Sequence, residues 1–105
     1  MNRRLLETAA SHELRGYILK VAQEARPLGA SLKLIESVLR QLQFDIEEYD
    51  VVNACGYLAG KGLVRITSVS NKTQGISRDI VHLTPEGEDV LDGTCVVDGV
   101  EVVEG

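Results

Sequence analysis

Residues 45–66 read D-I-E-E-Y-D-V-V-N-A-C-G-Y-L-A-G-K-G-L-V-R-I and decide the fold of this 105-residue chain. Asp45 followed by Glu48 is a capping-box pattern, so we predict that a helix begins there, with Phe44 and Tyr49 forming a hydrophobic staple. Gly60 and Gly62 permit the left-handed turn that ends such a helix. The β-branched residues that follow predict a strand over 63–69, a polar loop over 70–77 and a returning strand over 79–83.

Two further helices precede this stretch. Ser11 and Ser31 are their predicted N-caps, because a serine hydroxyl accepts a hydrogen bond from a free helical N–H. Each helix carries apolar residues at helical spacing. The predicted stripes are Leu14, Tyr17, Ile18, Val21, Ala22 and Ala25 in the first helix, and Leu32, Ile35, Leu39 and Leu42 in the second.

The order helix, helix, helix, strand, loop, strand is typical of the winged helix-turn-helix, an α+β fold. We therefore predict three helices and a two-stranded wing, followed by a short helix that begins at Thr84-Pro85 and a Val-rich tail. The chain divides into an N-terminal segment over 1–10, the winged-helix domain over 11–92 and the tail over 93–105. Asp98-Gly99 favours a type I′ hairpin between Thr94–Val97 and Val100–Val103, although a loosely ordered tail fits the composition equally well.

The formal net charge of −5 is unevenly distributed. Residues 84–105 hold seven acidic and no basic residues, whereas residues 1–83 hold 11 basic and 9 acidic residues. An acidic balance argues against binding nucleic acid, because phosphate contacts supply most non-specific affinity. That argument applies to the tail and does not exclude DNA binding by the nearly neutral body.

The chain has neither an apolar run long enough to span a bilayer nor a signal-peptide pattern, so we expect a cytoplasmic protein without membrane contact. Its two cysteines, Cys55 and Cys95, fit a reducing compartment. With His12 and His82 they show no metal-ligand spacing, and we expect no metal and no cofactor. No nucleophile lies near a base and no Gly-rich loop follows a strand, so we expect no enzymatic activity.

In this fold the third helix enters the major groove of duplex DNA and the wing contacts the backbone or minor groove. Glu47, Glu48 and Asp50 would repel phosphates there, unless they serve to complement the helix N-terminus. Ala54 is among the residues expected on the exposed side of this helix. The candidate DNA-binding residues are Lys33, Arg40, Asn53, Tyr57, Lys72 and Arg78.

Two functions follow as hypotheses. The first is a DNA-binding regulator of transcription, which we expect to be a homodimer because dimerisation doubles the number of phosphate contacts. The second is a protein-interaction module of the same fold, which binds a partner through its acidic helix or through the Val-rich tail added to a sheet edge.

Four stretches of the chain form a recognisable set of motifs: L-R-G-Y-I-L-K-V-A-Q-E-A (14–25), S-V-L-R-Q-L (37–42), L-A-G-K-G-L-V (58–64) and L-T-P-E-G-E-D-V-L-D-G (83–93). Over residues 14–103 the chain resembles small winged-helix proteins of Mu-like phages and prophages in these motifs. The family has no firmly assigned biochemical role, so the resemblance implies the fold and a phage setting and leans toward transcription control. Glu47, Glu48 and Asp50 depart from the pattern, since related proteins can carry Ser and Arg at the start of the third helix.

Overall fold

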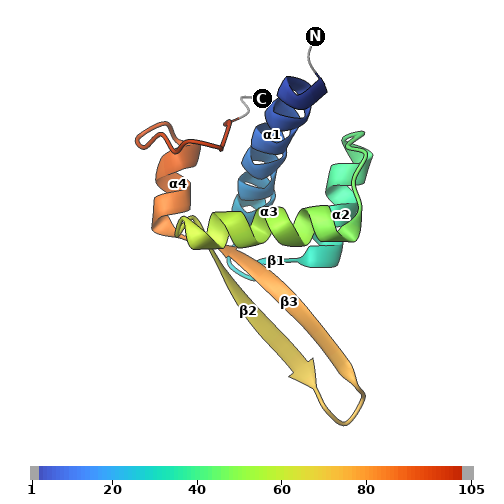
Figure 1. The fold of residues 1–105 in the computed structure, drawn as a ribbon. Coiled ribbons are helices and arrows are strands. Elements are labelled where there is room, and N and C mark those ends of the chain that lie inside the picture. The colour runs from blue at the N-terminus through green and yellow to red at the C-terminus, as the bar shows by residue number, and fades with distance from the viewer. Residues whose placement is uncertain (1–2, 103–105) are drawn as a thin grey trace.

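The computed structural model describes residues 3–102, with side chains from residue 7 onward. This part of the chain is mixed α+β, with four helices and one three-stranded antiparallel sheet, which confirms the predicted class and is compatible with a winged-helix-like arrangement (Figure 1). None of the described helices combines the length and apolar character needed to cross a membrane. In chain order the elements are α1 (Arg3–Glu24), β1 (Ala30–Ser31), α2 (Leu32–Gln41), α3 (Glu48–Gly60), β2 (Val64–Asn71), β3 (Ile76–Leu83) and α4 (Pro85–Leu91).

The sheet has the order β1-β3-β2, so its middle strand is the last in sequence. β1 contributes two residue pairs, with Ala30 opposite Val81 and Ser31 opposite Ile80. This strand was not predicted, because two residues are too few to show the alternation that identifies a strand. β2 and β3 pair without a break along their whole length.

The wing has longer strands and a shorter loop than predicted. Residues 70–71 continue β2 and residues 76–77 begin β3, which leaves residues 72–75 as the loop. The Asn71 side chain closes this loop by accepting a hydrogen bond from the Gln74 amide at 3.2 Å. All the residues at this end of the wing are exposed, so no apolar alternation distinguishes its strands from a polar loop.

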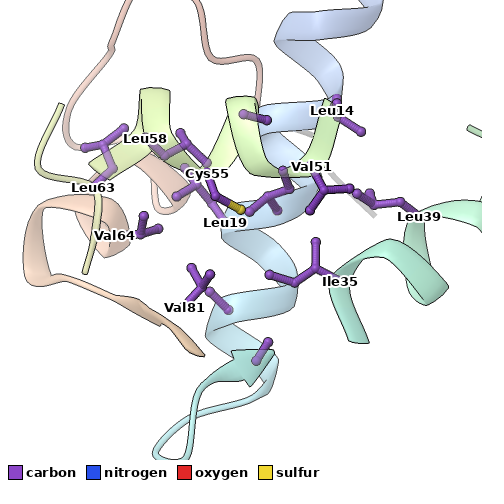
Figure 2. Packing of buried hydrophobic residues seen from close by; sticks show 14 of the residues in the cluster. Leu14, Leu19, Ile35, Leu39, Val51, Cys55, Leu58, Leu63, Val64 and Val81 are labelled. Carbon is purple, nitrogen blue, oxygen red and sulfur yellow. The ribbon is translucent and has the colours of Figure 1, made fainter. Parts of the chain in front are cut away.

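The core lies between α1, α2, α3 and the base of the sheet, and Figure 2 shows side chains from these elements converging. The apolar stripes predicted for the first and second helices point into it, and Ile18 and Leu39 are fully buried. Leu42 is an exception, since it is 46% exposed and forms the C-cap of α2. The largest fully buried side chains are Ile18, Leu19, Ile35, Leu39, Leu58, Val51, Val81, Val90 and Cys55.

α1 begins at Arg3, so Ser11 lies inside a continuous helix and the prediction that it is an N-cap is wrong. Residues 3–10 contain no proline or glycine, and several are strong helix formers, so nothing stops the helix from extending toward the N-terminus. The helix therefore continues across the boundary predicted between residues 10 and 11.

The N-terminus of α3 is displaced by two residues from its predicted position. Glu47, not Asp45, is the N-cap, and the Asp50 carboxylate accepts a hydrogen bond from the Glu47 amide at 2.7 Å. Ile46 is only 6% exposed, and burying it in the core keeps the preceding residues out of the helix. The cap therefore follows the apolar anchor, whereas the sequence pattern fits either register.

The predicted staple between Phe44 and Tyr49 is also wrong. The Phe44 ring packs edge-on against Tyr17 of α1, with ring centroids 5.6 Å apart, and Tyr49 is 64% exposed. Ile46 and Val51 occupy the staple positions relative to the true cap, and both belong to the core.

The caps of α2 and α4 are confirmed. Ser31 Oγ accepts a hydrogen bond from the Leu34 amide, and Thr84 Oγ1 accepts one from the Gly87 amide, both at 3.1 Å. Thr84 also donates to the Gly62 carbonyl oxygen at 2.7 Å, which joins the start of α4 to the turn that ends α3.

The two alternative caps of α3 can be separated by matched substitutions. We expect Asp50→Ala to lower the free energy of unfolding by about 1 kcal/mol, because the Glu47 amide loses its acceptor. Asp45→Ala should change it by less than about 0.5 kcal/mol, because an exposed residue without a capping role contributes little. Urea unfolding followed by circular dichroism measures both changes in free energy. A larger effect at Asp45 would show that Asp45 is the N-cap, as the sequence pattern predicts.

Candidate functional site

The outward face of α3 is the surface that a winged-helix-like arrangement leaves free. Val51, Cys55 and Leu58 point into the core, so helical periodicity turns Tyr49, Val52, Asn53 and Gly56 outward. These four residues are exposed, and no described atom beyond the helix itself lies within 4 Å of a Cβ built at Gly56. Residues 48–60 contain no lysine or arginine, so positive charge must come from neighbouring elements.

Two of the candidate cations lie together beside the start of α3. Lys33 of α2 and Arg78 of β3 line a shallow hollow of about 320 Å³, together with Glu48 and Asp79. Lys33 Nζ lies 3.9 Å from Glu48 Oε2, and both side chains are largely exposed. An exposed pair of this kind contributes little to stability, so Lys33 can exchange its partner for a phosphate at small cost.

The carboxylates at the start of α3 have structural partners. Asp50 accepts from the Glu47 amide, and Glu48 pairs with Lys33. Acidic side chains in the first turn also interact favourably with the helix dipole. Glu48 and Asp50 therefore stabilise the N-terminus of the helix, and their presence does not require an acidic binding surface.

The other cationic candidates lie apart from this hollow. Arg40, near the end of α2, pairs with Glu36 at 3.3 Å along the same helix. Lys72 is exposed in the loop at the tip of the wing. Among the predicted cations, the structure thus brings only Lys33 and Arg78 around one cavity.

Tyr57 lies on the side of α3 that faces α1, and Asn53 lies at the border between that side and the outward face. Asn53 is exposed and lines a groove between the two helices, whereas Ala54, predicted to be exposed, is 6% exposed and belongs to the core. Tyr57 is half-buried, and the Arg15 guanidinium of α1 stacks on its ring at 3.8 Å from the centroid. Its phenolic hydroxyl donates to the Asp98 carbonyl oxygen at 3.0 Å, so Tyr57 holds the C-terminal tail in place.

Residues 94–102 of the tail form a strap over α1 and α3. Arg15 Nη1 donates to the Gly99 carbonyl oxygen at 3.0 Å, and the Glu101 amide donates to the His12 carbonyl oxygen at 3.1 Å. Three valines of the strap pack against the core: Val97, Val100 and Val102.

The type I′ hairpin predicted for this tail is wrong over the described residues. Residues 94–102 form no strand, and Val103 lies outside the described residues. A hydrogen bond from the Val100 amide to the Val97 carbonyl oxygen closes a turn around Asp98-Gly99. Only Gly99 has a positive φ (+87°) there, whereas a type I′ turn needs positive φ at both central residues.

The strap depends on Gly16 and Arg15, which sequence reasoning did not select. Gly16 is buried in α1, and a Cβ at this position would collide with the Glu101 carbonyl oxygen. A glycine inside an otherwise favourable helix costs up to about 1 kcal/mol, which is the one sequence feature that points to close backbone packing here. The residue that approaches it is 85 positions away, so the sequence alone cannot name the partner.

The described residues contain no group of three His, Cys, Asp or Glu side chains arranged to hold a metal ion. Cys55 is buried in the core, and burial raises the pKa of its thiol to about 12. His82 is hydrogen-bonded through Nε2 to Thr67 Oγ1 at 3.1 Å, across the pair of wing strands. Cys55 and His82 therefore contribute to packing and to the sheet.

Comparison of the chain with protein-family models and with curated proteins finds no match.

Two glycine substitutions in different helices separate the loss of the strap contact from the general effect of replacing a helical glycine with alanine. We expect Gly16→Ala to displace the strap, because the new methyl group occupies the position of the Glu101 carbonyl oxygen, at a cost of about 1–3 kcal/mol. Gly56→Ala meets no neighbour and should instead stabilise the protein by up to about 1 kcal/mol. Hydrogen exchange at the Glu101 amide reports the strap directly, and unchanged protection in Gly16→Ala would show that the strap is not held against α1.

The two thiols should differ in reactivity. Cys95 is exposed, whereas Cys55 is buried with a pKa of about 12, so iodoacetamide at mildly alkaline pH should modify Cys95 alone in the folded protein. In the unfolded chain the Cys55 thiol ionises near its ordinary pKa of 9.0, so folding stability should fall as the pH rises above that value. Mass spectrometry of tryptic peptides checks the modification, and rapid alkylation of Cys55 in the folded protein would contradict its burial.

Proposed function

We propose that this protein is a winged helix-turn-helix that binds duplex DNA through α3 and the wing, as a regulator of transcription in a phage or prophage. One observation carries the proposal. The outward face of α3 is exposed, and Lys33 and Arg78 line one hollow beside the start of that helix. In this fold the N-terminal half of the third helix enters the major groove, so these two cations would meet phosphates at its border.

The chain order supports the same proposal. β1 separates α1 from α2 and pairs with β3, and β2 and β3 extend beyond the body as a two-stranded wing (Figure 1). Lys72, at the exposed tip of that wing, can contact a phosphate at a distance from α3. Asn53 is the residue of the open face suited to read a base, because its amide can pair with adenine.

The small number of cations sets the strength of this binding. Lys33, Arg78 and Lys72 supply about three phosphate contacts per chain, which predicts a slope of about −3 in log K against log salt concentration. Binding of one chain would therefore be modest and sensitive to salt.

A protein-interaction module is the second candidate, and the chemistry of α3 favours it. The helix has no basic residue, and its outward side chains Tyr49 and Val52 are 64% and 45% exposed. Exposed aromatic and aliphatic side chains on one helix face are typical of a surface that binds another protein.

DNA binding can be tested on fragmented DNA from the source genome, retained on the protein at two salt concentrations. We expect one fragment to be retained at physiological salt, and Lys33→Ala and Arg78→Ala each to reduce the salt slope by about 1. Lys20→Ala removes the same charge from α1, where Lys20 pairs with Glu24, and should leave the slope unchanged.

Three results of this experiment carry different conclusions. Retention of many fragments at low salt only would reduce the proposal to non-specific binding. An equal loss of slope in Lys20→Ala would place the contact surface elsewhere. No retention by folded protein at either salt would refute DNA binding and leave the protein-interaction module.

A further inference from the structure

The helix α2 has three sides of different chemistry, and Figure 1 shows it at the edge of the body opposite α4. Because an α-helix has 3.6 residues per turn, successive side chains are about 100° apart and each can be assigned to one side. The core side carries Ile35 and Leu39, which are fully buried. The charged side carries Lys33, Glu36 and Arg40.

The third side of α2 is uncharged, and we call it the neutral side. Its residues have the spacing i, i+3, i+4, i+7 and i+8, and the last of them is the C-cap: Leu34, Ser37, Val38, Gln41 and Leu42. Leu34 and Leu42 are 48% and 46% exposed. Val38, between them, is half-buried, yet it is not among the partly buried residues that pack against the core in the described part of the chain.

The neutral side differs from an ordinary solvated helix face. A helix face turned to water typically carries charged and polar residues, as the charged side of α2 does. The neutral side instead places Leu34, Val38 and Leu42 in a row along the helix, without a lysine, arginine or carboxylate among them. Removing these side chains from water is favourable, so the neutral side is suited to pack against another apolar surface.

The neutral side is complementary to itself. Leu34 and Leu42 each lie four residues from Val38, so a two-fold axis at Val38 places Leu34 of one copy level with Leu42 of a second, antiparallel copy. Each apolar residue of the row then meets an apolar residue. Lys33 and Arg40 lie more than about 100° around the helix from Val38, so no charge enters the contact. A second copy of this chain therefore matches the surface in both chemistry and spacing.

We infer that the neutral side of α2 is a dimer interface, in which α2 packs antiparallel against α2 of a second copy. The contact is short, because a helix of 10 residues is about 15 Å long. An interface of this size lies at the small end of specific interfaces, which predicts a dissociation constant in the micromolar range. No residue of α3 or of the wing belongs to the neutral side, so the inference does not rest on DNA binding.

The test compares the same substitution on two helices, at residues of similar exposure. Leu34→Glu places a carboxylate in the contact, whereas Val52→Glu adds it to the outward face of α3. Leu34 and Val52 are 48% and 45% exposed, so neither change should disturb folding, which circular dichroism checks. In sedimentation equilibrium of the full chain, we expect wild type and Val52→Glu to dimerise equally, and Leu34→Glu to weaken the dimer at least about tenfold.

A disulfide tests the antiparallel arrangement. With helix axes about 8–10 Å apart and Cα atoms about 2.3 Å from each axis, the two Val38 Cα atoms would lie about 4–6 Å apart, within disulfide range. Val38→Cys should therefore form a linked dimer on mild oxidation, in a chain that also carries Cys95→Ser to remove the exposed thiol. Leu34→Cys in the same chain should not, because each copy lies about 6 Å from the two-fold axis along its helix.

Three results would contradict the inference. Disulfide formation by Leu34→Cys as readily as by Val38→Cys would overturn the antiparallel arrangement, because a parallel pair places both residues opposite themselves. A wild type that is monomeric at several hundred micromolar would overturn the dimer. Equal effects of Leu34→Glu and Val52→Glu would overturn the assignment of the interface to α2.

Discussion

The packing of α3 across α1 and β3 is the constraint on which the remaining structure depends. Val51 and Leu58 of α3 are fully buried with Leu19 of α1 and Val81 of β3 in one cluster (Figure 2). Because an amphipathic helix has one apolar side, burying that side against α1 fixes which side remains open. The open face of α3 and the positions of the wing, the strap and the groove all follow from this orientation.

The two flanks of α1 differ in what covers them. On one flank the strap is held by Arg15, by Tyr57 and by backbone contact at Gly16, so residues 94–102 are part of the body. On the other flank, residues of α1 line an open, acidic groove. Each flank presents a different chemistry, and the wing side of α3 presents a third, with Lys33 and Arg78 around a hollow of mixed charge.

The predictions from local sequence patterns that are confirmed concern interactions contained within one short segment. The caps at Ser31 and Thr84 each join residues three apart, and the buried stripes through Ile18 of α1 and Ile35 of α2 each follow helical periodicity within one element. The cap of α3 was misplaced because Asp45 and Glu47 both begin acceptable patterns. The choice between them depends on the burial of Ile46, a contact with distant residues.

The order of the helices and of the two wing strands, the mixed α+β class and the separation of an acidic tail from a nearly neutral body could be predicted from the sequence alone. Three features depend on the folded chain: β1 pairs with β3, Lys33 and Arg78 share a hollow, and Tyr57 holds the strap. The physical reason is the range of the interactions. Hydrogen bonding and periodicity within a helix depend on residues three or four apart, whereas these contacts join side chains and backbone up to 51 residues apart along the chain.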